Sequence, residues 1–330
     1  MAVVGALPAA VRFVDSRSKS CNGRPIWSLD DYGETGVLGH GSFGTVIKAR
    51  YYGTGESVAI KILTSTSSQD ATLREADLLA ACSGHRSIVQ LRAMSLDPAT
   101  DALSLVMEYV GPSLSDVLRW RHARPFPEAD VRCVMRQLLA GAEHMHRCRV
   151  VHRDIKPDNV LVGGDRMSVK ICDLGLAMSM TEPPPYGRCG TRNYTAPEIL
   201  LGKPDYDATV DAWSLGCVMA ELLRGCPIFS GAEDDADQLL KIFEILGVPN
   251  KWSWPAYGSM PLAGELVTLP SILHCNRLRE MFPEHRLSAE GFQVLSGLLS
   301  CDADRRLSAT AALRHPWFTN NVDDAPECLI

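Results

Sequence analysis

The stretch VHRDIKPDNVLV, from Val151 to Val162, places several polar side chains between apolar residues. Transfer of a phosphoryl group needs little covalent chemistry, but it needs strict positioning and neutralisation of charge. Asp154 is suited to accept the proton of a hydroxyl, and Lys156 is suited to contact the moving phosphate. Asn159 and, farther along, Asp173 carry hard oxygen ligands for magnesium. A polar loop that only caps helices does not explain this combination and spacing.

A second stretch, GHGSFG (Gly39 to Gly44), has the spacing GxGxxG. Alone the spacing is weak, because it also occurs in dinucleotide-binding folds and in flexible turns. The dinucleotide version opens a helix, whereas TVIKARYY after Gly44 alternates like a strand. We therefore predict a strand hairpin whose glycines leave backbone N–H groups open to phosphates. Leu38 and Val46 flank the hairpin, placed to cover a flat apolar ring.

The run VAIK ends at Lys61 and has two interpretations. A lysine at the end of an apolar strand often extends from the edge into water. If Lys61 instead points inward, its charge requires an acidic partner, and Glu75 in the helical pattern TLREADLL offers one. That pair would leave the ammonium facing phosphate oxygens.

Composition excludes several classes of protein. The 330 residues have 46% apolar content, a net charge of -6 and a pI near 5.9, so bulk charge attracts neither nucleic acid nor an anionic membrane. No apolar run has the roughly 20 residues of a membrane span. The eleven cysteines do not have the spacing of zinc ligands. They suggest a reducing compartment, so we expect an intracellular protein of the nucleus, the cytoplasm or both. The start of the chain, free of acids until Asp15, keeps an organelle transit peptide as an alternative.

The order of patterns predicts an α+β fold with two lobes. Strand patterns and one helical pattern, QDATLREADLLAACSG, precede the break at Gly111-Pro112, and mostly helical patterns follow it. We predict a flexible extension over residues 1–28, a small antiparallel sheet with one main helix over 29–110, a larger helical lobe over 111–320 and a tail over 321–330.

These motifs together resemble the eukaryotic protein kinases over roughly residues 32–318. GxGxxGxV, VAIK, HRD with its Asn159, and Ala196-Pro197-Glu198 are all present, and the usual Asp-Phe-Gly appears as Asp173-Leu174-Gly175. The lysine in HRDIKPDN resembles that of serine/threonine kinases. The resemblance implies ATP and Mg²⁺ as cofactors and a protein substrate. It implies catalytic roles for Asp154, Lys156 and Thr191, metal binding by Asn159 and Asp173, and nucleotide binding by Leu38, Gly39, Gly41, Gly44, Val46, Ala59, Lys61, Glu75, Glu108 and Leu161.

Farther on, APEILLG, WSLGCVMAEL after Asp211, and DADRRLSATAALRHPWF resemble the group of cyclin-dependent and mitogen-activated kinases, with the cyclin-dependent kinases the better match. By that resemblance Asp211 ties the catalytic loop to a buried helix and Arg306 pairs with Glu198. A cyclin-like activating partner is one option, because QDATLRE only partly resembles the cyclin-contacting helix.

The activation segment departs from that group, whose phosphothreonine is held by three arginines. Arg74 and Arg153 match two of them, but Met178 stands at the third position and Tyr186 where the threonine belongs. The regulatory site remains open: it is Thr181, Tyr186 or no residue at all. Glu182 offers a permanent but weaker charge than a phosphate. We therefore expect basal activity without threonine phosphorylation.

Two further departures concern inhibition and substrate choice. Ser42-Phe43 stands where members of the group often have Thr-Tyr, so inhibitory tyrosine phosphorylation is chemically impossible at Phe43, whereas Ser42 remains a modifiable residue. Thr195 replaces the arginine that shapes a proline pocket in this group, and Gly190 also differs, so we expect relaxed specificity. A kinase-fold scaffold, or a partner-dependent pseudokinase with little catalytic activity, is the alternative function. The scaffold predicts losses among the site residues, and they are all present.

Overall fold

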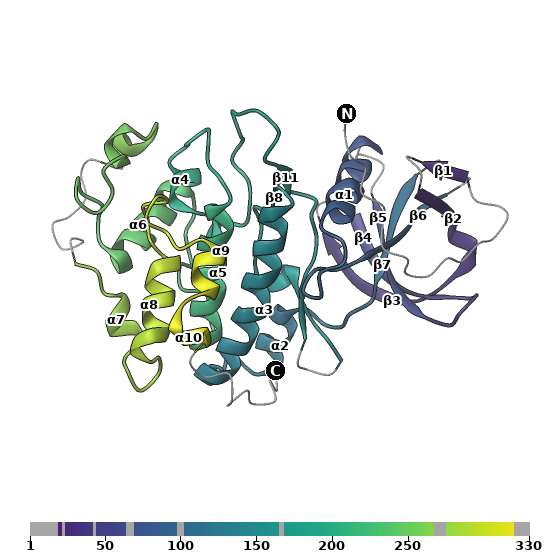
Figure 1. Cartoon of the computed structure of the whole chain (residues 1–330), viewed down its shortest axis with the longest axis horizontal. Coiled ribbons are helices and arrows are strands. Elements are labelled where there is room, and N and C mark those ends of the chain that lie inside the picture. The colour runs from purple at the N-terminus through teal and green to yellow at the C-terminus, as the bar shows by residue number, and fades with distance from the viewer. Residues whose placement is uncertain are drawn as a thin grey trace. The chain divides into compact units, whose positions relative to one another are not determined.

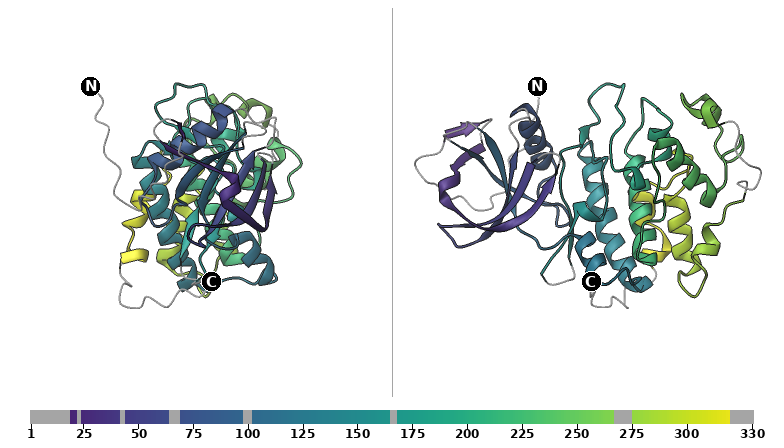
Figure 2. Two further views of the ribbon diagram at one scale, coloured as in Figure 1. Left: turned by 90° about the vertical axis from the view of Figure 1, so that its right-hand side faces the viewer. Right: turned by 180° about the vertical axis from the view of Figure 1, so that it is seen from behind.

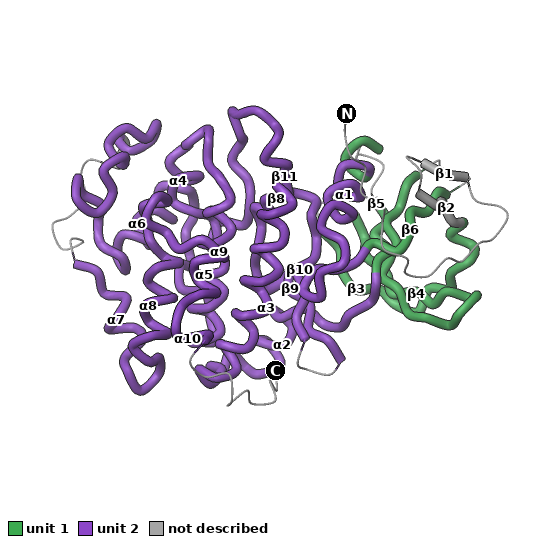
Figure 3. Tube along the Cα trace, in the orientation of Figure 1, with its two compact units in different colours: residues 1–72, 91–107 green, residues 73–90, 108–330 purple. Residues whose placement is uncertain are grey.

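The computed structural model describes residues 19–21, 24–41, 44–63, 69–97, 102–164, 168–266 and 275–319. It divides into two compact units (Figure 3): unit 1 comprises residues 1–72 and 91–107, and unit 2 comprises residues 73–90 and 108–330. The helix α1 (Gln69–Ala81) begins in unit 1, and most of it belongs to unit 2. The predicted α+β class, with a strand-rich part before a larger helical part, is confirmed. The predicted tail (321–330) and Ser42 lie outside the described residues.

Unit 1 is built on a seven-stranded sheet in the order β1-β2-β6-β7-β5-β4-β3. The pairs β3–β4, β4–β5 and β6–β7 are antiparallel as predicted, but β2 runs parallel to β6. Residues 19–28, which the sequence placed in an N-terminal extension, contain β1 and β2. The elements are β1 (Lys19–Cys21), β2 (Arg24–Ser28), η1 (Leu29–Asp31), β3 (Tyr32–Gly41), β4 (Gly44–Tyr51), β5 (Ser57–Leu63), β6 (Leu91–Leu96) and β7 (Leu103–Glu108).

The sheet of unit 1 carries its core and its candidate nucleotide residues on opposite faces. The core contains Tyr32, Ala49, Val58, Ile60, Ala93 and Val106. Successive side chains of a strand point to opposite faces. Val46 on β4 pairs with Gly39 on β3 and with Lys61 on β5, so these three residues form one row across the sheet away from that core. The predicted hairpin is confirmed, because β3 ends at Gly41 and β4 begins at Gly44.

Unit 2 is organised around α5 (Thr209–Arg224), in which every residue from Val210 to Leu223 is buried. The helices α3 (Glu128–Arg147) and α8 (Ala289–Leu298) pack against it (Figure 1; Figure 2). Gly225 ends α5 with φ +85, where a Cβ would lie 1.7 Å from the Ala123 carbonyl oxygen, so only glycine fits there. The other helices are α2 (Leu114–Trp120), η2 (Pro157–Asn159), η3 (Arg192–Tyr194), α4 (Pro197–Leu200), α6 (Asp235–Leu246), η4 (Tyr257–Ser259), η5 (Ala263–Leu266), α7 (Leu278–Met281), α9 (Ala309–Leu313) and α10 (Pro316–Thr319).

The helices of the described ranges were compared with the requirements of a membrane span. None of them combines the length and the apolar content that a membrane-spanning segment requires.

Candidate active site

Two short strand pairs in unit 2 hold the loop that contains HRDIKPDN. β8 (Val150–Val151) pairs with β11 (Met178–Ser179), and β9 (Val160–Val162) pairs with β10 (Val169–Ile171). The loop therefore begins after β8 of the first pair and ends at β9 of the second pair. The Cys172 N–H donates to the Asn159 carbonyl oxygen at 2.9 Å, so the chain around Asn159 lies beside the chain that leads to Asp173.

Asp154 is the centre of a polar cluster. It is 8% exposed, and its Oδ1 accepts hydrogen bonds from the backbone N–H and the Oγ1 of Thr191, at 2.8 and 2.7 Å. The Lys156 Nζ lies 3.0 Å from Asp154 Oδ2 and donates to Thr191 Oγ1 at 2.6 Å. The structure thus brings together all three residues predicted to be catalytic. The carboxylate is held in one orientation by donors, which suits it to accept a proton.

Asp211 on α5 fixes the backbone of this loop. It is fully buried, and its two oxygens accept the backbone N–H groups of His152 at 2.9 Å and Arg153 at 2.8 Å. Burial raises the pKa of Asp211, but the hydrogen bonds from His146 and from the His152 backbone together hold it below the ordinary value. Arg153 adopts φ +67, a conformation unfavourable for a side chain larger than glycine, and the hydrogen bond to Asp211 supports it. The predicted tie between the loop and a buried helix is confirmed.

The two residues predicted to bind metal lie in this same part of unit 2. The Asn159 Nδ2 donates to the Asp154 carbonyl at 2.9 Å and to Asp154 Oδ2 at 3.1 Å, which directs the amide oxygen of Asn159 away from Asp154. Asp173 has φ +63, and its Oδ1 accepts the Gly175 N–H at 3.3 Å. In the described part of the chain, no three His, Cys, Asp or Glu side chains gather into a metal site. Two oxygen ligands suit Mg²⁺, which keeps waters and takes its remaining ligands from phosphates.

The residues predicted to bind nucleotide occur in both units. In unit 1, Lys61 and Ala59 are buried, Val46 is half-buried, and Leu38 is exposed. A Cβ at Gly39 would meet no described atom within 4 Å, so the space beside Gly39 is open. Lys61 belongs to unit 1 and Glu75 to unit 2, so their pairing stays a prediction.

In unit 2, two candidate nucleotide residues have defined surroundings. Glu108 Oε1 accepts from Lys170 Nζ at 2.6 Å and from the Gln90 N–H at 2.9 Å. Its backbone N–H donates to the Gln90 carbonyl, so that N–H is already satisfied within the protein. Leu161 is half-buried on β9.

Glu182 forms the main ionic contact of the activation segment with α1. The Arg74 Nη2 lies 2.7 Å from both carboxylate oxygens of Glu182, and the Ser179 N–H donates to Glu182 Oε1 at 3.0 Å. The Arg153 guanidinium instead donates to the Leu176 carbonyl and the Tyr206 hydroxyl. The side chain of Glu182 is partly exposed, so the ion pair with Arg74 is of the weaker surface kind.

The two residues considered for regulation differ in their surroundings. Thr181 is exposed, and its Oγ1 lies 2.7 Å from the Ser179 hydroxyl. Tyr186 is half-buried, and its hydroxyl donates to the Glu182 carbonyl at 2.9 Å. Its ring packs against the ring of Tyr206, with 5.3 Å between the two ring centroids. Tyr186 therefore takes part in holding the segment.

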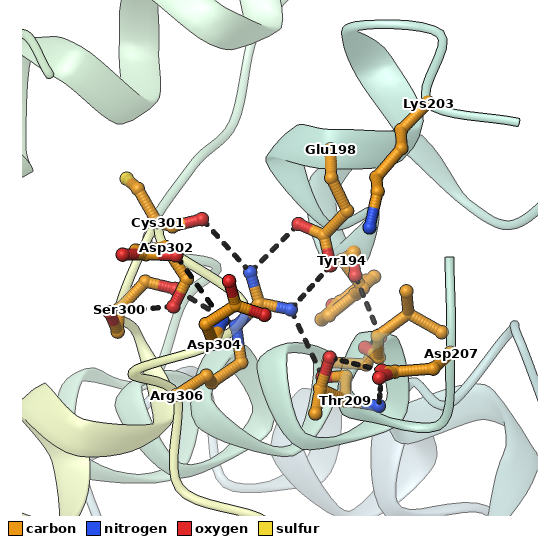
Figure 4. A network of polar contacts seen from close by, with 12 residues as sticks. Tyr194, Glu198, Lys203, Asp207, Thr209, Ser300, Cys301, Asp302, Asp304 and Arg306 are labelled. Atoms are coloured by element: carbon orange, nitrogen blue, oxygen red, sulfur yellow. Dashed lines mark hydrogen bonds and ion pairs between the residues drawn. The ribbon is translucent and has the colours of Figure 1, made fainter. Parts of the chain in front are cut away.

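The end of the activation segment is anchored by a buried ion pair. Figure 4 shows the guanidinium of Arg306 pointing at Glu198, with Nη1–Oε1 and Nη2–Oε2 distances of 2.6 and 2.8 Å. The remaining N–H groups of Arg306 donate to the carbonyl oxygens of Ser300, Cys301 and Thr209. The predicted pair of Arg306 with Glu198 is confirmed.

A second anchor was not predicted from the sequence. Arg188 donates through Nε and Nη2 to Asp235 at the start of α6, at 2.8 and 2.6 Å, and Arg192 Nε lies 3.3 Å from the same carboxylate. The hydrogen bond and charge of Arg188, which outweigh burial, hold the pKa of Asp235 below its ordinary value. The partners are more than forty residues apart, and no local pattern links them.

Comparison with known proteins identifies the family. The protein kinase domain matches residues 32–318, which is most of the chain. The chain belongs to the protein kinase family. This kinase is 47% identical over 309 residues to a protein of Oryza sativa subsp. japonica named "Putative cyclin-dependent kinase F-2", covering 91% of the chain and 93% of the relative.

Two further relatives extend the comparison. Over 304 residues the kinase is 38% identical to cyclin-dependent kinase G-2 of Oryza sativa subsp. indica, covering 88% of the chain and 42% of that relative. It is 34% identical over 306 residues to serine/threonine-protein kinase ppk23 of Schizosaccharomyces pombe, covering 91% of the chain and 74% of that relative. It thus spans less than half of the G-2 relative. The kinase is a serine/threonine protein kinase similar to the cyclin-dependent kinases, as its motifs predicted.

Replacing Thr191 with Val is expected to lower kcat of this kinase by about 10- to 100-fold, because small misplacements of reacting groups are costly. The substitution removes the hydroxyl that holds Asp154 and Lys156 together. Steady-state phosphorylation of a generic basic protein measures the effect. Thr191→Ser keeps the hydroxyl and is the matched control, and equal kcat values for the two variants would contradict the role given to Oγ1.

Proposed function

We propose that this kinase transfers the γ-phosphate of ATP, with Mg²⁺ as cofactor, to serine and threonine hydroxyls of protein substrates. The observation that carries the proposal is the cluster of Asp154, Thr191 and Lys156, in which the carboxylate is oriented by three donor atoms. Asp154 accepts the proton that the substrate hydroxyl loses as the oxygen attacks phosphorus. Thr191 keeps Asp154 in that orientation, and the Lys156 ammonium offsets negative charge on the transferring group.

The residues present fit the proposed cofactors. Asn159 and Asp173 would hold Mg²⁺, which supplies neutralisation of phosphate charge when bound. In unit 1, the open space beside Gly39 and the buried Lys61 suit phosphate oxygens. The positive φ of Asp173 supports a functional role, because such backbone strain clusters at active sites.

Magnesium-dependent transfer tests this proposal. The full chain is incubated with ATP labelled in the γ-phosphate and with a basic acceptor protein, with magnesium and then with excess EDTA. We expect labelled acceptor only with magnesium. Label transfer that survives EDTA would exclude the metal site at Asn159 and Asp173, and absence of label in both cases would favour the scaffold alternative.

We also propose that the kinase has basal activity without phosphorylation of its activation segment. The ion pair of Glu182 with Arg74 supports this, because it occupies one of the two arginines that match the phosphate-binding set. Arg153 supports it as well, because its guanidinium already donates within the protein. A carboxylate carries less charge than a phosphate, so the contact is weaker but permanent.

Replacing Glu182 with Gln is expected to lower the activity of unphosphorylated kinase, at most about fivefold, since exposed ion pairs contribute about 0.2–1 kcal/mol. Initial rates measured after phosphatase treatment, with mass spectrometry to verify that Thr181 and Tyr186 are unmodified, provide the test. Glu280→Gln removes one partner of another surface ion pair, with Arg277, and is the control. Activity that appears only once Thr181 is phosphorylated would refute the proposal.

Relaxed preference for proline after the target residue is a further proposal. Thr195 donates through Oγ1 to the Thr191 carbonyl at 3.0 Å, so it stabilises the segment internally where the group has an arginine. Gly190 has φ +89, and a Cβ there would lie 2.6 Å from the Arg153 carbonyl oxygen. The backbone at this point therefore depends on glycine.

We also propose a partner and a cellular location for this kinase. Two relatives are named cyclin-dependent kinases, which supports a cyclin-like activating partner. Helix α1 with Arg74 is where such a partner would act. None of the described cysteines forms a disulfide, which supports a nuclear or cytoplasmic location.

A further inference from the structure

Two cysteines and two histidines gather in unit 2 where the carboxyl ends of two helices meet. Cys82 directly follows α1, and His85 lies in the turn that comes next. His144 is in the last turn of α3, and Cys148 directly follows that helix. All four residues belong to unit 2, and none of them has a role in the phosphate transfer described above. We refer to these four residues as the cysteine–histidine cluster.

The side chains of the cluster form a continuous series of contacts. The Cys82 thiol forms a side-chain hydrogen bond with Cys148. The Cys148 Sγ lies 3.7 Å from the His144 Nε2. The imidazole rings of His144 and His85 stack, with 5.0 Å between the ring centroids and 24° between the ring planes. The two sulfur atoms are therefore neighbours, and one of them also contacts an imidazole nitrogen.

The arrangement of the cluster suits sulfur chemistry and does not suit a metal ion. Ligands of zinc converge on one point from tetrahedral directions, whereas these two rings stack nearly parallel to each other. Within the described ranges, no three such side chains are placed to share a metal ion. Two neighbouring thiols can instead form a disulfide, and in a reducing compartment such bonds are typically transient and redox-sensing.

The two thiols of the cluster differ in access to an oxidant and in reactivity. Cys148 is half-buried, so a small oxidant can reach its sulfur, and the His144 imidazole beside it can accept the thiol proton. Cys82 is fully buried. Burial, followed by the charge and the hydrogen bond of Cys148, raises the pKa of Cys82 to about 12. Cys148 is therefore the thiol that reacts first, and Cys82 is the thiol that resolves the product.

We propose that Cys82 and Cys148 form a redox modification site, at which a hydroperoxide converts the two thiols into a disulfide. The Cys148 sulfur attacks one peroxide oxygen as its proton passes to His144, and the O–O bond breaks. The departing oxygen takes that proton and leaves as water or an alcohol. Cys148 becomes a sulfenic acid.

The second step closes the disulfide. The Cys82 sulfur attacks the sulfur of the Cys148 sulfenic acid, so the S–S bond forms and the S–O bond breaks. The oxygen leaves as water with the proton of Cys82. The two thiols have together lost two electrons to the peroxide, and a dithiol reductant reverses the reaction by disulfide exchange.

The disulfide would join two elements that serve the candidate active site. α1 carries Arg74, which contacts Glu182 of the activation segment. Cys148 lies shortly before β8, after which the catalytic loop begins. Because the thiols already contact each other in this conformation, the bond favours it over conformations in which the end of α1 leaves α3. It also reduces the freedom of the unfolded chain.

Mapping of disulfides in the full chain tests the site without relying on phosphate transfer. Reduced kinase is treated with a small excess of hydrogen peroxide, free thiols are alkylated under denaturing conditions, and proteolytic peptides are analysed by mass spectrometry. We expect a peptide pair linked through Cys82 and Cys148 that dithiothreitol separates. The linked kinase is expected to have a Tm higher by about 4 °C or more than the reduced kinase.

Variants separate the roles of the residues. In Cys82→Ala, Cys148 is expected to accumulate as sulfenic acid, with dimedone labelling at least about fivefold higher than in the unmodified kinase, because the resolving thiol is absent. His144→Gln is expected to slow formation of the link by about tenfold or more, because the proton acceptor is lost. Cys226→Ser removes an exposed cysteine and is the control, in which the link forms as in the unmodified kinase.

Three results would overturn the inference while leaving the proposed kinase function unaffected. The first is complete alkylation of Cys82 after peroxide treatment, with Cys148 either reduced or oxidised to sulfinic acid. The second is a disulfide of Cys148 with a different cysteine. The third is a linked product with a Tm equal to or below that of the reduced kinase, because the bond would then not belong to the conformation described. Equal rates of linking in His144→Gln and the unmodified kinase would overturn the role of His144.

Discussion

Replacing Asp154 with Asn is expected to lower kcat by about 10²–10⁴-fold, the usual contribution of a general base. The amide cannot take the proton of the attacking hydroxyl. Two donors of Thr191, Oγ1 and the backbone N–H, converge on Asp154 Oδ1 at 2.7 and 2.8 Å. In the variant they face either the N–H₂ group of the amide, which cannot accept a hydrogen bond, or its uncharged oxygen. Initial rates of phosphate transfer under saturating ATP and protein acceptor measure the effect.

The matched control for this substitution is Asp205→Asn. Asp205 is a surface aspartate whose only described ion pair is a long one, 3.8 Å from Lys203 Nζ. We expect its kcat to equal that of the unmodified kinase. If Asp154→Asn retained more than about a tenth of the activity, a role for Asp154 as the base would be contradicted.

Replacing Arg306 with Met is expected to lower the free energy of unfolding by about 3–5 kcal/mol, because removal of one partner leaves an uncompensated buried charge. Glu198 is 1% exposed and accepts two short hydrogen bonds from Arg306. The substitution also removes the donors to three carbonyl groups. Urea denaturation followed by circular dichroism measures the loss.

Arg277 provides the control. It is largely exposed and forms a surface ion pair with the exposed Glu280, so Arg277→Met is expected to change stability by at most about 0.5 kcal/mol. Equal denaturation midpoints for the Arg277 and Arg306 variants would contradict the anchoring role of the buried pair.

The residues of the catalytic loop were predictable because one short stretch contains them. Asp154, Lys156 and Asn159 lie within six positions of each other, and their chemical types limit what they can do together. The glycine hairpin was also predictable, because the alternation after Gly44 excludes a helix. The contact of Asp211 with the loop and the pair of Arg306 with Glu198 followed only from the resemblance to known kinases.

Other features depend on contacts between distant residues and leave no local pattern. One such feature is the parallel pairing of β2 with β6, because the alternation of side chains along a strand does not reveal which other strand lies beside it. The anchor of Arg188 on Asp235 is another, since many charged residues could serve as its partner. Burial of Glu221 beside Tyr194 likewise becomes visible only when α5 is seen to be enclosed on all sides.

We expect the unmodified chain to phosphorylate serine and threonine hydroxyls of proteins. The most direct measurement incubates phosphatase-treated kinase alone with magnesium and γ-labelled ATP in the presence of a basic acceptor protein, followed by phosphoamino-acid analysis of that acceptor. We expect label on phosphoserine or phosphothreonine. Label released only as inorganic phosphate, or no use of ATP at all, would show that the unmodified chain does not phosphorylate serine or threonine.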